Sequence, residues 1–158
     1  MLSPPALLAQ VHKLDSFDSG VPALDDWLKR RAQSNQAHGA SRTYVVADEA
    51  NRVAGYYAMA AGALAVVDAP GRIKRNMPNP IPMAIIGRLA VDRSYQGRRL
   101  GAALLQDAVL RLRQAASILG MRGVIVHTIS EDAKSFYEHH GFVASPRQPM
   151  TLIMSLAE

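Results

Sequence analysis

A short basic segment between a buried strand and a long helix is the first place where this sequence could do chemistry. The apolar run 83–91 predicts the strand, and the apolar face of residues 97–119 predicts the helix. Free N–H groups and the positive dipole end at a helix N-terminus form an anion site. Because Arg98 and Arg99 add charge, the segment 96–102 predicts a phosphate or pyrophosphate site. An ordinary strand–helix turn with surface arginines remains the alternative, since short glycine motifs recur by chance.

Positive charge is concentrated in the middle of the chain. The 158 residues contain 18 Lys+Arg and 13 Asp+Glu, and 14 of the basic residues are arginine. Residues 69–122 hold ten basic and two acidic side chains, whereas the remainder is net acidic. Arginine's planar fork suits phosphate recognition, so this segment is a candidate surface for a polyanion. A solvated basic face without a partner is the other interpretation.

Hydrophobic periodicity predicts an alternating set of strands and helices. The strands are expected at 6–14, 43–47, 53–67, 83–91, 124–129, 142–144 and 150–156, the helices at 22–37, 97–119 and 132–140, and a long loop at 68–82. Helices alternating with strands around the centre imply parallel pairing there and hairpins at the ends. We therefore expect one α/β or α+β domain that spans residues 1–158.

Several classes of protein are excluded by what the sequence lacks. It has no cysteine, which excludes a disulfide scaffold, a thiolate zinc site and a cysteine nucleophile. His139 and His140 are adjacent and would point about 100° apart on a helix, so we expect no metal site. The longest uncharged stretch, 53–67, is 15 residues, and a membrane span needs about 20. No segment resembles a targeting signal, so the expected location is the cytoplasm, away from membranes.

Two motifs resemble the GNAT N-acetyltransferase superfamily. Gln96, Gly101 and the strand 89–91 match the pyrophosphate-loop pattern Gln/Arg-x-x-Gly-x-Gly/Ala, and residues 133–142 match the pattern A-x-x-F-Y-x-x-x-G-F. Arg99 departs from the pattern, because the family usually has glycine there. If that backbone has a positive φ, arginine costs stability or weakens cofactor binding.

The N-terminal half narrows the resemblance. Residues 17–20, 24–28, 43–45, 55–57 and 87–92 are similar to the bacterial GNAT toxins of type II toxin–antitoxin pairs. The resemblance implies a GNAT acyl-CoA N-acyltransferase fold, with a mixed central sheet of six or seven strands flanked by helices. It implies direct transfer of acetyl from acetyl-CoA to the α-amino group of aminoacyl-tRNA, which blocks translation. Coenzyme A is then the cofactor, a ribbon-helix-helix antitoxin the partner, and a homodimer the assembly.

The same resemblance assigns roles to particular residues. Tyr137 would be the general acid that protonates the leaving thiolate, because a phenol with a pKa of about 10 is protonated at neutral pH. Packing beside Phe136 is the alternative role for this tyrosine. The cofactor-binding residues would be Leu89, Ala90, Val91, Gln96, Gly97, Arg98, Arg99, Leu100, Gly101, Ala102 and Phe136. The candidate contacts to tRNA phosphates are Arg72, Lys74, Arg75, Arg88, Lys29 and Arg30.

Two other functions remain open on the sequence alone. One is a GNAT enzyme that acetylates a small amine or a protein N-terminus. Such an enzyme is expected to have acidic residues around the acceptor site, because they attract a cationic amine, whereas the middle of this chain is basic. The other is a binding module that keeps the fold but has lost affinity for the cofactor, for which Arg99 is the main argument.

Overall fold

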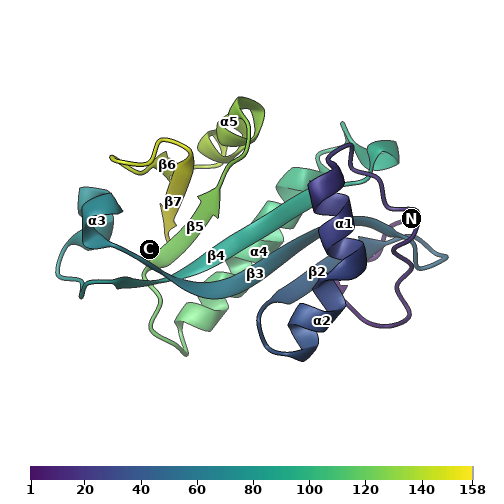
Figure 1. The fold of residues 1–158 in the computed structure, drawn as a ribbon, viewed down its shortest axis with the longest axis horizontal. Coiled ribbons are helices and arrows are strands. Elements are labelled where there is room, and N and C mark those ends of the chain that lie inside the picture. The colour runs from purple at the N-terminus through teal and green to yellow at the C-terminus, as the bar shows by residue number, and fades with distance from the viewer. Residues whose placement is uncertain (158) are drawn as a thin grey trace. The chain divides into compact units, whose positions relative to one another are not determined.

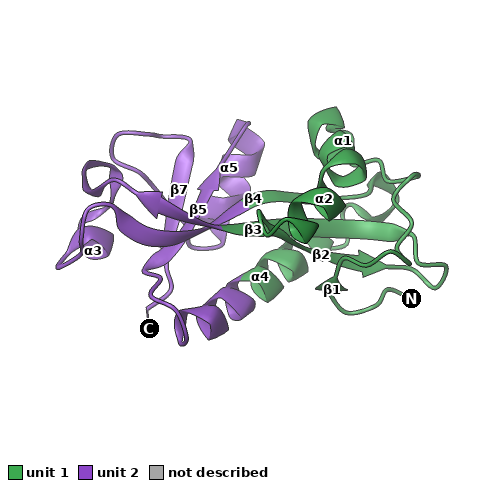
Figure 2. Cartoon of the chain, turned by 60° about the horizontal axis from the view of Figure 1, so that its bottom comes forward, with its two compact units in different colours: residues 1–60, 87–108 green, residues 61–86, 109–158 purple. Residues whose placement is uncertain are grey.

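The computed structural model describes residues 1–157, which form two compact units (Figure 2). Unit 1 comprises residues 1–60 and 87–108, and unit 2 comprises residues 61–86 and the chain from residue 109 onward. Each unit is built from two separate stretches of the chain. The single domain expected from the sequence stays a prediction.

Seven strands and five α-helices make up the fold in the described part of the chain (Figure 1). The strands are β1 (Ala6–Leu7), β2 (Arg42–Ala47), β3 (Val53–Leu64), β4 (Ile81–Val91), β5 (Gly123–His127), β6 (Val143–Ala144) and β7 (Thr151–Ser155). The helices are α1 (Pro22–Arg30), α2 (Ala32–Ala37), α3 (Gly71–Lys74), α4 (Leu100–Ala116) and α5 (Glu131–His139), with 3₁₀ turns η1 (Val66–Asp68) and η2 (Arg93–Tyr95).

The strands form one mixed sheet in the order β1-β2-β3-β4-β5-β7-β6. In unit 1, β2 is antiparallel to β1 and to β3. In unit 2, Met83–Ile85 of β4 run parallel to Gly123–Ile125 of β5, and β7 is antiparallel to both β5 and β6. A mixed sheet of seven strands flanked by helices confirms the predicted fold class.

Several predicted boundaries are wrong, each for a local reason. The strand expected at 6–14 ends at Leu7, because the Ala9 N–H donates to His12 Nδ1 at 2.9 Å and closes a turn. The helix expected at 22–37 is two helices, separated at Arg31, whose φ of −123° is not helical. The loop 68–82 is not structureless, since it contains α3.

Successive tyrosines of β3 fix helices to the two faces of the unit 1 sheet. Tyr56 is fully buried and donates a hydrogen bond to the Leu24 carbonyl of α1 at 2.7 Å. Burial raises the pKa of Tyr56 well above its ordinary value, despite the nearby positive charge of Arg88. Because neighbouring strand residues face opposite ways, Tyr57 points to the other face. There it donates to the Asp107 carboxylate of α4 at 2.5 Å, which anchors this helix to β3.

The core of unit 2 surrounds the start of β5. The buried side chains of Ile81, Met83, Ile125 and Ile153 lie in one cluster there. Gly123 lies close to the backbone of a neighbouring strand: a Cβ on this residue would lie 2.5 Å from the Met154 carbonyl oxygen. That atom belongs to the paired strand β7, so it has no freedom to move aside.

This close approach predicts that Gly123→Ala lowers the free energy of unfolding by about 2–3 kcal/mol, since the added methyl overpacks against backbone. Gly120→Ala is the matched control, because a Cβ there meets nothing within 4 Å. We expect the control to change stability by less than about 0.5 kcal/mol. Urea denaturation followed by circular dichroism measures both, and equal stabilities for the two variants would contradict the packing described.

Candidate active site

The loop that follows β4 in unit 1 is held by side chains on both of its sides. Asp92 caps η2 and accepts a hydrogen bond from the Ser94 N–H at 3.0 Å. Its second carboxylate oxygen accepts from the Asp18 N–H at 2.9 Å. Partial burial opposes ionisation of Asp92, but the hydrogen bonds from Ser94 and Asp18 outweigh it and lower the pKa of this carboxyl. The loop therefore begins from a fixed, charged cap.

Gln96 joins three segments of unit 1. Its amide nitrogen donates to the Val91 carbonyl at 2.9 Å and to the Ser19 carbonyl at 2.8 Å. The first bond closes the turn at the end of β4, and the second ties that turn to the segment before α1. The sequence analysis predicted that Gln96 binds the cofactor. In the structure, its side-chain amide nitrogen bonds to two backbone carbonyls and so shapes the loop.

Two residues with left-handed backbone lie between Gln96 and α4. Gly97 has a φ of 80° and Arg99 a φ of 63°. Neither conformation is helical, which explains why α4 begins at Leu100 and not at the predicted residue 97. Glycine adopts a positive φ freely, whereas arginine is strained there. The sequence therefore identified the right position: Arg99 occupies the left-handed backbone in place of the family's usual glycine.

The first turn of α4 presents free backbone donors. The Ala103 N–H is the first to bond back along the helix, to the Arg99 carbonyl at 3.1 Å. The N–H groups of residues 100–102 have no acceptor within the helix. With the dipole of a 17-residue helix behind them, they can bind an anion such as a pyrophosphate.

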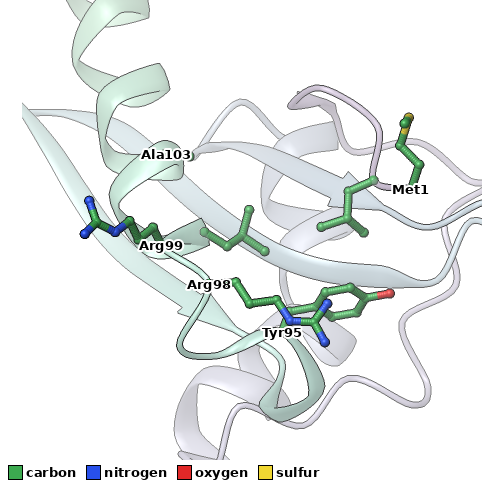
Figure 3. Close-up of a pocket in the computed structure, with 7 residues that line it drawn as sticks. Met1, Tyr95, Arg98, Arg99 and Ala103 are labelled. Atoms are coloured by element: carbon green, nitrogen blue, oxygen red, sulfur yellow. The ribbon is translucent and has the colours of Figure 1, made fainter.

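A pocket of about 440 Å³ lies beside this turn (Figure 3). Its lining consists of Met1, Leu2, Tyr95, Arg98, Arg99, Leu100 and Ala103. The Arg98 guanidinium lies over the Tyr95 ring, 5.4 Å from its centroid. Figure 3 shows the Arg99 side chain pointing the opposite way from Arg98. The loop thus presents one cation on each side, and Tyr95 is a lining residue that the sequence did not reveal although it directly precedes Gln96.

The three residues of β4 that were expected to contact the cofactor differ in the burial of their side chains. Ala90 is buried in the apolar cluster beneath α1, so only its backbone faces away from the core. Leu89 and Val91 are half-buried and alternate with it along β4. Direct side-chain contact with a ligand is therefore open to Leu89 and Val91 and closed to Ala90.

Tyr137 lies in α5 of unit 2, where aromatic packing fixes its ring. The side chain of Ser130 caps this helix by accepting from the Ala133 N–H at 3.1 Å. The Tyr137 ring makes edge contacts with Phe136 and Phe142, at centroid distances of 5.1 and 5.3 Å. The tyrosine is 9% exposed, and burial raises its pKa to about 12. It is thus a protonated phenol in a defined position, as a general acid must be.

Phe136 is the second α5 residue expected at the cofactor. Its ring is half-buried and contacts the His140 ring at 4.7 Å. The Phe136 carbonyl also lies 2.8 Å from His140 Nδ1. His140 therefore supports this aromatic cluster.

The cations proposed to bind tRNA fall into separate groups. Arg72, Lys74 and Arg75 are exposed on α3 and at its end, in unit 2. Lys29 and Arg30 are exposed in the last turn of α1, in unit 1, where they also complement the helix dipole. Arg88 is half-buried in unit 1, with its guanidinium 4.4 Å from the centroid of the Trp27 ring.

Metal clusters and membrane spans are both lacking from the described residues. Among residues 1–157, no group of three or more His, Asp or Glu side chains could hold a metal ion. Within the same part of the chain, no helix is long and apolar enough to cross a membrane.

Comparison with protein families identifies the class. A model described as "Acetyltransferase (GNAT) domain" matches residues 40–144, well over half of the chain. The chain belongs to the GNAT acetyltransferase family, and it has both the fold and the strand–loop–helix turn expected from the resemblance. Acetyl-CoA is the acetyl donor of this family, and solved neighbours include complexes with acetyl-CoA.

The individual relatives are toxins. A tRNA-acetylating toxin of Mycobacterium tuberculosis is 44% identical over 156 residues, which cover 99% of this chain and 93% of that protein. AtaT in complex with acetyl-methionyl-tRNAfMet has a TM-score of 0.91 and 26% identity, covering 98% of this chain and 95% of that one. A tyrosine-to-phenylalanine mutant of AtaT, bound to the C-terminus of the antitoxin AtaR and to acetyl-CoA, has a TM-score of 0.82 and 25% identity, with coverage of 98% and 93%.

The strained backbone at Arg99 predicts that Arg99→Gly raises the free energy of unfolding by about 1 kcal/mol. Arg98→Gly is the control, because this neighbour has no left-handed backbone and its side chain stacks on Tyr95. We expect the control to lose stability, since glycine adds freedom to the unfolded chain. Urea denaturation measures the free energy of unfolding of both variants. A lower value for Arg99→Gly than for the wild type would contradict backbone strain at Arg99.

Burial of Tyr137 predicts a late-titrating phenol. The difference in tyrosinate absorbance between the wild type and Tyr137→Phe should show a pKa of about 12, and a value near 10 would mean that the ring is open to solvent. Below pH ~10 the protonated form is shared by the folded and unfolded states, so it has no effect on the pH dependence of stability. From about pH 10 to 12 the unfolded chain ionises first, so the wild type should lose more stability than Tyr137→Phe.

Proposed function

We propose that this protein transfers the acetyl group of acetyl-CoA to the α-amino group of an aminoacyl-tRNA, and that this blocks translation. The observation that carries the proposal is the 44% identity to a tRNA-acetylating toxin over 99% of the chain. The structural match to AtaT in complex with acetyl-methionyl-tRNAfMet supports the same acceptor.

The loop before α4 fits the diphosphate of acetyl-CoA. Free N–H groups of residues 100–102 point out of the first helical turn, and Arg98 and Arg99 supply positive charge around them. When bound, acetyl-CoA supplies an activated thioester, which an amine can attack directly. The absence of cysteine from the sequence agrees with a transfer that needs no acyl-enzyme.

Tyr137 has the properties of the acid that this reaction requires. Departure of coenzyme A leaves a thiolate, which is stabilised when a nearby group donates a proton. The raised pKa of Tyr137 keeps its hydroxyl protonated at any physiological pH, and edge contacts with Phe136 and Phe142 hold the ring. No general base is needed to prepare the nucleophile, because the amine of an aminoacyl ester is less basic than lysine and is substantially neutral near pH 7. As the C–N bond forms, the nitrogen gives up one proton to solvent. As the C–S bond breaks, Tyr137 gives its proton to the thiolate and regains one from solvent.

The acceptor is polyanionic, and the exposed cations suit it. Arg72, Lys74 and Arg75 lie on one short stretch of unit 2, and Lys29 and Arg30 on one turn of unit 1. We assign these residues, with Arg88, to phosphates of the tRNA. Such contacts give affinity that depends on salt and carry little sequence information.

Regulation by an antitoxin completes the proposal. A neighbouring toxin is described in complex with the C-terminus of its antitoxin AtaR, and another complex of the pair contains DNA. We propose a partner of the ribbon-helix-helix type for this chain, a homodimer as the toxin assembly, and the cytoplasm, where aminoacyl-tRNA is used, as the place of action.

A binding module without activity is the one competing function that a structural observation favours, namely the strained arginine at position 99. The two functions differ in a direct assay. The protein is incubated with radiolabelled acetyl-CoA and total aminoacylated tRNA, and we expect label in the tRNA fraction. Transfer to a polyamine or a peptide but not to tRNA would refute the toxin function. Failure to bind acetyl-CoA by calorimetry would support the binding module.

Removal of the Tyr137 hydroxyl predicts a loss of turnover without a loss of binding. We expect Tyr137→Phe to lower kcat about 10²- to 10⁴-fold, the usual contribution of a general acid, with little change in the KM for acetyl-CoA. Tyr57→Phe is the contrasting variant, since it removes the hydrogen bond to Asp107 and should lower stability while turnover is kept. Steady-state kinetics below the melting temperatures separate the two, and full turnover in Tyr137→Phe would remove this residue from the mechanism.

A further inference from the structure

Arg122 is a half-buried cation of unit 2 that the proposed reaction does not use. Its guanidinium donates two hydrogen bonds to the backbone of α3: from Nε to the Ile73 carbonyl at 3.1 Å, and from Nη2 to the Arg72 carbonyl at 2.9 Å. The last carbonyls of a helix accept no hydrogen bond within it, so these bonds satisfy groups that α3 leaves unpaired. The positive charge also lies at the favourable end of the helix dipole.

The backbone of Arg122 is itself fixed to the sheet of unit 2. Its N–H donates to the Pro82 carbonyl at the start of β4, at 2.8 Å. Its carbonyl accepts from the Leu156 N–H after β7, at 3.2 Å. Arg122 therefore connects a strand framework to a helix of only four residues, which has no stability of its own.

Other contacts hold the same segment from its two ends. The Ser145 hydroxyl donates to the Asp68 carbonyl at 2.6 Å, and the Asn79 side chain accepts from the Val66 N–H at 3.1 Å. Ile73 is buried in the core of unit 2. The segment 66–79 is thus held near both ends and by a buried side chain, and Arg122 adds the two hydrogen bonds to the carbonyls of α3.

The segment that contains α3 presents positive charge to solvent. Arg72, Lys74 and Arg75 are exposed, and Asp68 is the one acid of residues 66–82. The Asp68 carboxylate has a cation of its own, because Arg147 Nε lies 4.0 Å away. The three exposed cations therefore keep their charge for an external anion.

We propose that Arg122 is a positioning residue for the acceptor: it holds the α3 cations (Arg72, Lys74 and Arg75) in one arrangement that matches phosphates of the tRNA. This inference rests on the proposed function and adds to it a residue that does not touch tRNA. A preformed set of cations binds a polyanion more tightly than a mobile set, because less conformational entropy is lost on binding. Arginine is required, since a lysine cannot donate to two carbonyls from one planar group.

Arg122→Lys tests the inference without changing the net charge. We expect the KM for aminoacyl-tRNA to rise about three- to tenfold, while kcat and the KM for acetyl-CoA stay unchanged. Amide hydrogen exchange in residues 71–77 should speed up in the same variant. Arg42→Lys is the matched control, because Arg42 Nη1 also donates to a helix carbonyl, that of Gln36 at 3.0 Å, at the end of α2. We expect this control to leave the KM for tRNA unchanged.

Combining the Arg122 substitution with a variant that lacks the α3 cations shows whether Arg122 acts through them. The variant Arg72→Gln, Lys74→Gln and Arg75→Gln should weaken tRNA binding and reduce its salt dependence. The expected reduction is about 0.9 in the log–log slope for each duplex phosphate that these side chains no longer neutralise. In that background Arg122→Lys should raise the KM for tRNA no further. Arg122→Gln, which also lacks the fork, serves as a second variant and should behave as Arg122→Lys does.

Several outcomes would overturn the inference. An unchanged KM for tRNA in both Arg122 variants would do so, and so would an additive effect in the triple-glutamine background. A parallel fall in kcat, acetyl-CoA affinity and melting temperature would show a role in general stability instead. If the wild type acetylates no tRNA, the proposed function itself fails, which is distinguishable because the wild-type assay is read before any variant.

Discussion

Hydrogen bonds between the segment before α1 and the loop before α4 determine where both of these helices begin. The Gln96 amide donates to the Ser19 carbonyl, the Asp92 carboxylate accepts from the Asp18 N–H, and the Arg93 N–H donates to the Asp18 carbonyl at 2.8 Å. Two parts of the chain more than seventy residues apart thus form a single turn structure. This turn structure constrains the backbone that leads through Gly97 and Arg99, both left-handed, to the first turn of α4.

The same turn structure explains why the loop can hold Arg99 in a strained, left-handed backbone conformation. A left-handed arginine persists only where its surroundings determine the backbone more strongly than its own preference does. Before Arg99, the hydrogen bond from Gln96 to the Val91 carbonyl constrains the backbone. After Arg99, the hydrogen bond between Tyr57 and Asp107 anchors α4 to β3. The backbone before α4 is therefore shaped by Gln96, Tyr57 and Asp107, none of which lies in the first turn of that helix.

The sequence predicted those parts of the site that depend on local pattern. The strand before Gln96, the donors at the start of α4 and the aromatic pair Phe136 and Tyr137 all follow from periodicity and from the resemblance to one family. The expectation that Arg99 could need a positive φ was also correct. These features are set by residues close together in the chain, so their pattern is visible without a structure. In contrast, residues 68–82 were expected to form a loop because they contain four prolines, and α3 within them was missed. The residues that support this segment, Arg122 and Ser145, lie far away in the chain.

The φ of 63° at Arg99 has a consequence at the level of the gene. Every arginine codon becomes a glycine codon by one change in its first base, so the strained loop is a single mutational step from a relaxed one. Such a change would relax the backbone before α4. It would also remove one of the two arginine side chains that line the pocket beside this loop.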